Sequence, residues 1–161
     1  MYKRILAPVD GSHTSTLGLE QAVRLAKNQG ARLRIIHVVD ESVLTQFPDV
    51  MTGTGDLINR LINDGRTVLK NAMTLAKRQG VKAESVMYEN LIGFVAELVL
   101  KEATKWRADI IVMGTHGRRG VTHMLLGSDA EAVVRSSLVP VLLVRGAPAA
   151  EKKRERKKRK P

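Results

Sequence analysis

Residues 109–128 read DIIVMGTHGRRGVTHMLLGS. The apolar run at the start predicts a buried strand, and the glycines Gly114 and Gly117 follow it directly. Gly127 and Ser128 then stand before a second segment with helical periodicity. Glycine allows positive φ and close approach of a ligand to the backbone. The first N–H groups of a helix lack partners and carry partial positive charge, so this strand–loop–helix pattern suits a phosphate group.

The same stretch allows a second interpretation that needs no ligand. Ser128 and Glu131 form a capping-box pattern, in which the serine side chain caps the helix that follows. His116 and Arg118 could face anionic oxygens in the loop, whereas acidic residues after Ser128 would oppose an anion. From spacing alone, a phosphate site and a helix cap remain equally open.

Outside this stretch, apolar runs alternate with helical periodicity along the chain. Strands are predicted at residues 3–9, 32–39, 81–88, 109–113 and 139–145. Helices are predicted at residues 13–29, 57–76, 91–106 and 128–137, with Gly30 and Gly80 as stops and Asn90 as a cap. This alternation predicts an α/β fold in which helices cover both faces of a mostly parallel five-stranded sheet.

The order of the elements also predicts where a ligand would bind. In open parallel sheets, ligands lie outside the carboxyl ends of the strands, where the strand order reverses. Asp10, in the segment PVDGS after the first strand, is therefore a candidate for ribose hydroxyls or a metal. Taken alone, however, this residue is better interpreted as a turn aspartate that bonds its own backbone. The polar strand 81–88 is expected at a sheet edge, and Pro140 indicates either the first residue of its strand or an edge strand.

Composition limits the class of protein. The chain has 161 residues, which favours one domain, and 43% of them are hydrophobic. It has no cysteine, which excludes disulfides and thiolate metal sites, and no apolar run long enough for a membrane span. No signal-peptide pattern is present at the N-terminus, so a cytoplasmic protein is expected.

The charge distribution predicts two parts, a folded domain at residues 1–146 and a basic tail at residues 147–161 that is expected to be disordered. The net charge is +11, and residues 151–161 contribute +6 of it through eight Lys and Arg against two Glu. Such a run cannot bury apolar surface. Residues 152–160 could bind nucleic acid or another anionic surface nonspecifically, or serve only as a solvated tail.

Taken together, PVDGS, the strand end HVV and the spacing G-x-x-G-x9-G-S resemble the universal stress protein family over residues 1–146. The resemblance implies a Rossmann-like, doubly wound, three-layer α/β/α fold. Members with this glycine signature bind ATP, and members commonly form homodimers through the last strand, here residues 139–145. The basic tail departs from the compact family pattern.

The resemblance also implies roles for individual residues. Val9 and Asp10 would contact adenine and ribose, and Val39 would pack on the base. The remaining candidates are Pro8 beside them, Met113 and Gly114 along the nucleotide, and His116, Gly117, Arg118, Gly127, Ser128 and Asp129 around the phosphates. Asp10 is also the candidate contact to Mg²⁺.

Four kinds of function are compatible with these observations, one of them a structural dimer without a ligand. The favoured hypothesis is an ATP-binding regulatory module in stress response. The alternatives are a slow ATPase or phosphoryl-transfer enzyme organised by Asp10, and a polyanion-binding protein that acts through the tail. His13, His37 and His123 are scattered along the sequence and are interpreted as ordinary helix, strand or surface residues.

Overall fold

Five strands form one sheet in the computed structural model, which describes residues 1–40, 54–90, 94–117 and 126–146. The strands are β1 (Arg4–Pro8), β2 (Arg32–Asp40), β3 (Ala83–Asn90), β4 (Ile110–Gly114) and β5 (Val141–Val144). Their order is β3-β2-β1-β4-β5, and every neighbouring pair is parallel. The predicted parallel sheet is confirmed, as are the two edge strands.

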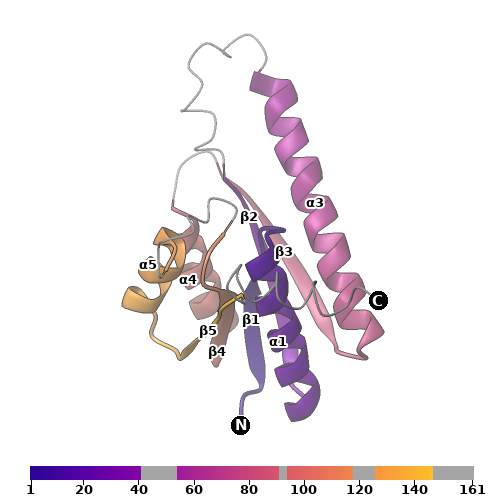
Figure 1. The fold of residues 1–161 in the computed structure, drawn as a ribbon, viewed down its shortest axis with the longest axis vertical. Coiled ribbons are helices and arrows are strands. Elements are labelled where there is room, and N and C mark those ends of the chain that lie inside the picture. The colour runs from indigo at the N-terminus through magenta and orange to yellow at the C-terminus, as the bar shows by residue number, and fades with distance from the viewer. Residues whose placement is uncertain (41–53, 91–93, 118–125, 147–161) are drawn as a thin grey trace, which may run out of the picture.

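Helices cover both faces of this sheet. Two of them, α1 (His13–Gln29) and α3 (Thr54–Arg78), lie on one face, and α4 (Val95–Trp106) and α5 (Ser128–Ser136) lie on the other (Figure 1). The three layers agree with the predicted α/β/α arrangement. Within the described residues, no helix combines the length and the apolar character needed to cross a membrane.

Two apolar clusters fill the spaces between the layers. Successive side chains of a strand point to opposite faces, so Ile5 and Ala7 pack under α1 and α3 while Leu6 packs under α4 and α5. In the same way Ile35 and Ile36 of β2 belong to different clusters. Strands covered on both faces are mostly apolar, which explains the uninterrupted apolar runs of β1 and β4.

The ends of α1 lie where the sequence predicts them. The helix runs from His13 to Gln29, and the Ser12 hydroxyl accepts a hydrogen bond from the Ser15 N–H at its start. Gly30 ends it in the left-handed conformation, with φ of 63°. A side chain would be strained at this φ, so glycine is the residue that stops the helix most readily.

The predicted start of α4 is wrong. Asn90 caps no helix; it is the last residue of β3 and pairs with Asp40 of β2. The helix begins at Val95, after Phe94, and no side chain caps it. The parallel ladder extends through residue 90, and this long-range pairing takes precedence over the local capping preference of asparagine.

Helix α1 is seated against β4 by two glycines. A Cβ atom at Gly18 would lie 2.8 Å from the backbone N of Gly114 and 2.9 Å from the carbonyl carbon of Met113. A Cβ atom at Gly114 would lie 2.6 Å from the carbonyl carbon of Thr14. Neither position has room for a side chain, so the helix backbone packs directly on the strand backbone.

Replacing Gly18 with Ala should therefore destabilise the fold. The added methyl group meets backbone atoms that cannot rotate away, and overpacking of this kind costs about 1–3 kcal/mol. Gly55→Ala is the matched control, because Gly55 also lies in a helix but no atom is within 4 Å of its Cβ position. Urea unfolding should show a lower free energy of unfolding for Gly18→Ala but not for Gly55→Ala. Equal stability of the two variants would contradict the close packing of α1 on β4.

On the opposite face, a charged cluster joins α4 to β2 and β3. The Arg34 guanidinium pairs with Glu102 and, at 2.9 Å, with Glu84, and it lies 4.7 Å from the Trp106 ring centroid. The Tyr88 hydroxyl donates to the second oxygen of Glu102 at 2.6 Å. Glu102 is only 1% exposed, so its charge is tolerated because both its oxygens are hydrogen-bonded.

Removing Arg34 should leave a buried carboxylate without its cation. Arg34→Met should lower the free energy of unfolding by about 3 kcal/mol at neutral pH, as expected when a buried ion pair loses one member. The double variant Arg34→Met, Glu102→Leu should lose less than the sum of the two single variants. Purely additive losses in urea unfolding would show that the pair is not coupled.

The pH dependence of this loss provides a second check. The hydrogen bond from Arg34 holds the pKa of Glu84 below its ordinary value. The stability that Glu84 contributes is thus present above its unfolded-state pKa and is lost as the pH falls through its lowered folded-state pKa. The native protein and Arg34→Met differ in their free energy of unfolding, and part of this difference comes from Glu84. That part should shrink as the pH falls through the same interval.

Candidate functional site

The strand order reverses between β1 and β4. These strands pair through Ile5 with Ile110 and Leu6 with Ile111, and the chain proceeds from them toward opposite edges of the sheet. The loops that follow β1 and β4 leave from the same side of the sheet. Residues 9–12 and residues 115–117 therefore meet at the switch point where parallel sheets bind ligands.

Asp10 lies at the centre of this meeting point. Its Oδ1 accepts the Ser12 N–H at 2.8 Å, and its own N–H donates to Ser15 Oγ at 3.3 Å. A Cβ atom at Gly117 would lie 2.7 Å from Asp10 Oδ2. The turn interpretation of Asp10 is thus confirmed, and the same carboxylate also packs against the glycine loop.

The reason for glycine in this loop differs from the expected one. Positive φ occurs at Gly11, Gly30 and Gly80 among the described glycines, and not at Gly114 or Gly117. Close packing explains these two positions instead. Gly114 makes room for α1, and Gly117 makes room for the Asp10 carboxylate.

Backbone hydrogen bonds close the two ends of the loop on each other. Gly127 N–H donates to Thr115 O at 2.8 Å, and Thr115 N–H donates to Val144 O at 3.0 Å. The Thr14 hydroxyl donates to His116 O. A Cβ atom at Gly127 would lie 3.3 Å from Thr115 O and 3.5 Å from His116 Cα. The beginning of the loop therefore lies next to the start of α5.

The capping-box interpretation of Ser128 is wrong. The N-cap of α5 is Gly127, Ser128 is the first helical residue, and no side chain makes a capping hydrogen bond. Gly127 takes the cap position because its N–H is held by Thr115, which ends the loop one residue earlier than expected. Ser128 is exposed at the helix start.

The charges at the start of α5 partly oppose an anion. Asp129 and Glu131 both lie in the first turn, where negative side chains interact favourably with the helix dipole. Glu131 forms an ion pair with Arg135 at 2.8 Å, which offsets its charge. Asp129 is exposed. Acidic side chains in this first turn therefore disfavour a phosphate bound at the helix start.

The apolar candidates lie at the inner side of the site. Val9, Val39 and Met113 are buried, and Pro8 is partly buried. The backbone of Val9 is already engaged, because its N–H donates to Ile36 O at 2.8 Å and its carbonyl accepts from His37 Nδ1 at 2.7 Å. A base at Val9 would thus make apolar contacts or use the second lone pair of that carbonyl.

His37 is a supporting residue that the sequence did not single out. It is buried under α3, where a Cβ atom at Gly65 would lie 2.6 Å from its Cδ2. This contact explains why the glycine inside α3 is required. His37 holds the Val9 carbonyl immediately before Asp10, a role that only the strand pairing reveals.

The remaining candidates are Arg118 and the possible Mg²⁺ ligands. Arg118 lies outside the described residues. Within the part of the chain that the structure describes, no cluster of three or more His, Cys, Asp or Glu forms a metal site. The predicted site has two carboxylates, Asp10 and Asp129, and a Mg²⁺ ion at Asp10 would depend on phosphate oxygens for further ligands.

Comparison with known proteins shows the family. The Universal stress protein family profile matches residues 1–145, and the chain belongs to that family. Universal stress protein MJ0531 of Methanocaldococcus jannaschii is 38% identical over 146 residues, which cover 90% of this chain and 83% of that protein.

Solved structures show the same fold. The structure of MJ0577, also from Methanocaldococcus jannaschii, superposes with a TM-score of 0.82 at 29% identity, covering 92% of this chain and 99% of that one. A universal stress protein from Archaeoglobus fulgidus, solved in complex with dAMP, has a TM-score of 0.66 at 20% identity, covering 89% and 98%. The second likeness shows the fold alone.

Proposed function

We propose that this protein is an ATP-binding universal stress protein, a regulatory module whose conformation or partner choice depends on the bound nucleotide. The observation that carries the proposal is the contact between Asp10 and Gly117 at the switch point of the sheet. Side chains are missing at Gly117 and Gly127, where a Cβ would approach Asp10 and Thr115. The absence of side chains there lets Asp10 and the two ends of the glycine loop come together, and this arrangement would present their backbone and the start of α5 to a nucleotide.

In this proposal the two loops hold different parts of the nucleotide. Val9, Val39 and Met113 form the apolar side for the base, and Asp10 accepts from the ribose hydroxyls or contacts Mg²⁺. His116, Gly117, Gly127 and Ser128 surround the phosphates at the start of α5. Mg²⁺ would offset the acidic first turn of α5, since it neutralises phosphate charge and binds through few carboxylates. The dAMP complex of a relative with this fold supports a nucleotide as the ligand class.

A thermal-shift titration of the full chain with ATP, ADP, AMP and GTP, with and without Mg²⁺, tests this proposal. A ligand at one hundred times its Kd stabilises a protein by about 2.7 kcal/mol. The native protein should be stabilised selectively by ATP. The Gly117→Val, Gly127→Val double variant should bind at least about tenfold more weakly, a loss of about 1.4 kcal/mol, because valine would displace Asp10 and meet Thr115.

Gly55→Val serves as the control, because the Cβ position at Gly55 lies in open space. It should bind ATP like the native protein. A cooperative unfolding transition without ligand establishes that each variant is folded. Asp10→Asn provides a smaller change in the same site. Equal ATP affinity of the native protein and the double glycine variant would refute the proposal.

ATP turnover should be slow. One oxygen of Asp10 is held in the turn by Ser12 and the other faces Gly117, so this carboxylate is a poor general base. Phosphate release should remain below ~1 s⁻¹, the low end of typical enzyme turnover. Sustained release above that rate, lost in the double glycine variant, would instead establish the ATPase or phosphoryl-transfer alternative.

The last strand supports an additional proposal, that the protein forms a homodimer through residues 139–145. Strand β5 lies at an edge of the sheet, and Leu142 on it is 42% exposed. Leu138, just before it, is 93% exposed. Apolar side chains at an open edge favour pairing with a second chain.

The basic segment 152–160 lies outside the described residues, and its binding to polyanions stays a prediction.

A further inference from the structure

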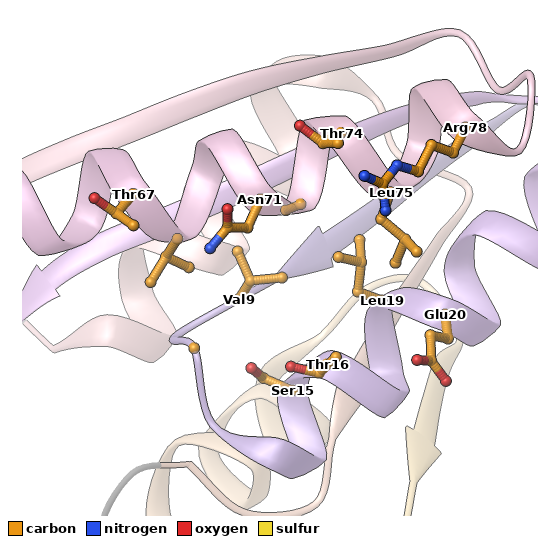
Figure 2. Close-up of a pocket in the computed structure, with 13 residues that line it drawn as sticks. Val9, Ser15, Thr16, Leu19, Glu20, Thr67, Asn71, Thr74, Leu75 and Arg78 are labelled. Atoms are coloured by element: carbon orange, nitrogen blue, oxygen red, sulfur yellow. The ribbon is translucent and has the colours of Figure 1, made fainter.

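A groove runs between α1 and α3 on one face of the sheet. It has a volume of about 500 Å³, within the range of small-molecule sites. Figure 2 shows Val9 and Leu19 between the two helices, with Leu75 facing them from α3. Val9, Leu19 and Ala72 are buried core residues, so the floor of the groove is apolar.

Most of the polar side chains around the groove are already satisfied. Four hydroxyl groups line it, and each donates to a backbone carbonyl at the start of, or within, its own helix. Ser15 and Thr16 donate to Ser12 O, Thr67 donates to Asn63 O, and Thr74 donates to Lys70 O. These hydroxyls therefore have no proton left to donate to a ligand.

Two donors on α3 remain. The side chains of Asn71 and Arg78 make no hydrogen bond or ion pair with another described residue. They are seven residues apart, which places them on the same side of the helix about 10 Å from each other. Figure 2 shows the Asn71 amide and the Arg78 guanidinium on the groove side of α3, with the guanidinium above Leu75.

The charge at one end of the groove favours an anion. Glu20 lines the groove from α1, but its carboxylate points away from α3, whereas the Arg78 guanidinium turns toward Leu75 (Figure 2). A ligand that fits these features has an elongated apolar body, an acceptor opposite Asn71 and an anionic group at Arg78. An aliphatic carboxylate combines the apolar body with the anionic group.

We propose that the groove between α1 and α3 is a second binding site, for a small aliphatic molecule with a carboxylate at one end. The site is separate from the glycine loop, because Gly117, Gly127 and Ser128 do not line it. It borders the loop after β1 through Gly11 and shares Val9 with the side proposed for the base, and the Cβ position of Gly11 lies 2.9 Å from Val68 of α3. The proposal does not depend on whether a nucleotide binds.

Decanoate, below its micelle concentration, is the probe. It should bind the full chain in calorimetry and shift the amide signals of residues 15–20 and 67–78 in ¹H–¹⁵N spectra. Decanol should bind through the floor alone, and decyltrimethylammonium should bind more weakly than either. Absence of decanoate binding at millimolar concentration, or shifts confined to residues 115–117 and 126–129, would overturn the proposal.

Paired variants separate the groove from general surface effects. Arg78→Gln should weaken decanoate about three- to fivefold, as expected for an exposed ion pair, and leave decanol unchanged. Arg66→Gln is its control, because Arg66 is also exposed on α3 but does not line this groove. Equal effects of the two arginine variants would show that the carboxylate is not held at Arg78.

A second pair tests the apolar floor. Thr16→Trp should block the groove and abolish binding of both decanoate and decanol. Thr104→Trp is the control, because Thr104 is likewise an exposed helical threonine whose hydroxyl donates four residues back, to Leu100 O at 3.1 Å. Binding unchanged by Thr16→Trp in a folded variant would place the probe elsewhere and refute the proposal.

Discussion

The direct contact between the backbones of α1 and β4 is the constraint on which the site depends. Gly18 and Gly114 bring the helix so close to the strand that neither residue could carry a side chain. Because α1 begins directly after the β1 loop, this contact also determines where that loop lies. Thr14, in the first turn of α1, then reaches the carbonyl of His116 at the start of the glycine loop.

The site follows from this placement. The loops after β1 and β4 are about a hundred residues apart in the chain, yet Asp10 and Gly117 touch because α1 and β4 are held together. His37 supports the loop after β1, because its ring holds the Val9 carbonyl directly before Asp10. Gly65 in turn allows α3 to cover His37. Glycines thus serve this fold mainly by letting backbones approach one another, and only some of them by adopting positive φ.

The two faces of the sheet are held in different ways. The α1 and α3 face is aliphatic, with a groove between the two helices. The α4 and α5 face contains the charged cluster of Arg34, Glu84 and Glu102, which joins α4 to β2 and β3. Burying the Glu102 carboxylate is costly unless both its oxygens keep their hydrogen bonds to Arg34 and Tyr88, so this cluster restricts how α4 can sit on the sheet.

The sequence by itself determined the order of the elements, the parallel sheet and the positions of its edges, because apolar periodicity and helix-stop glycines are local signals. It also identified Asp10 and the glycine loop as candidates. Only the tertiary structure decided that Gly117 makes room for a carboxylate, that Ser128 follows the cap and that Asn90 ends a strand. Those outcomes depend on strand pairing and on contacts between segments far apart in the chain, and no local preference encodes them.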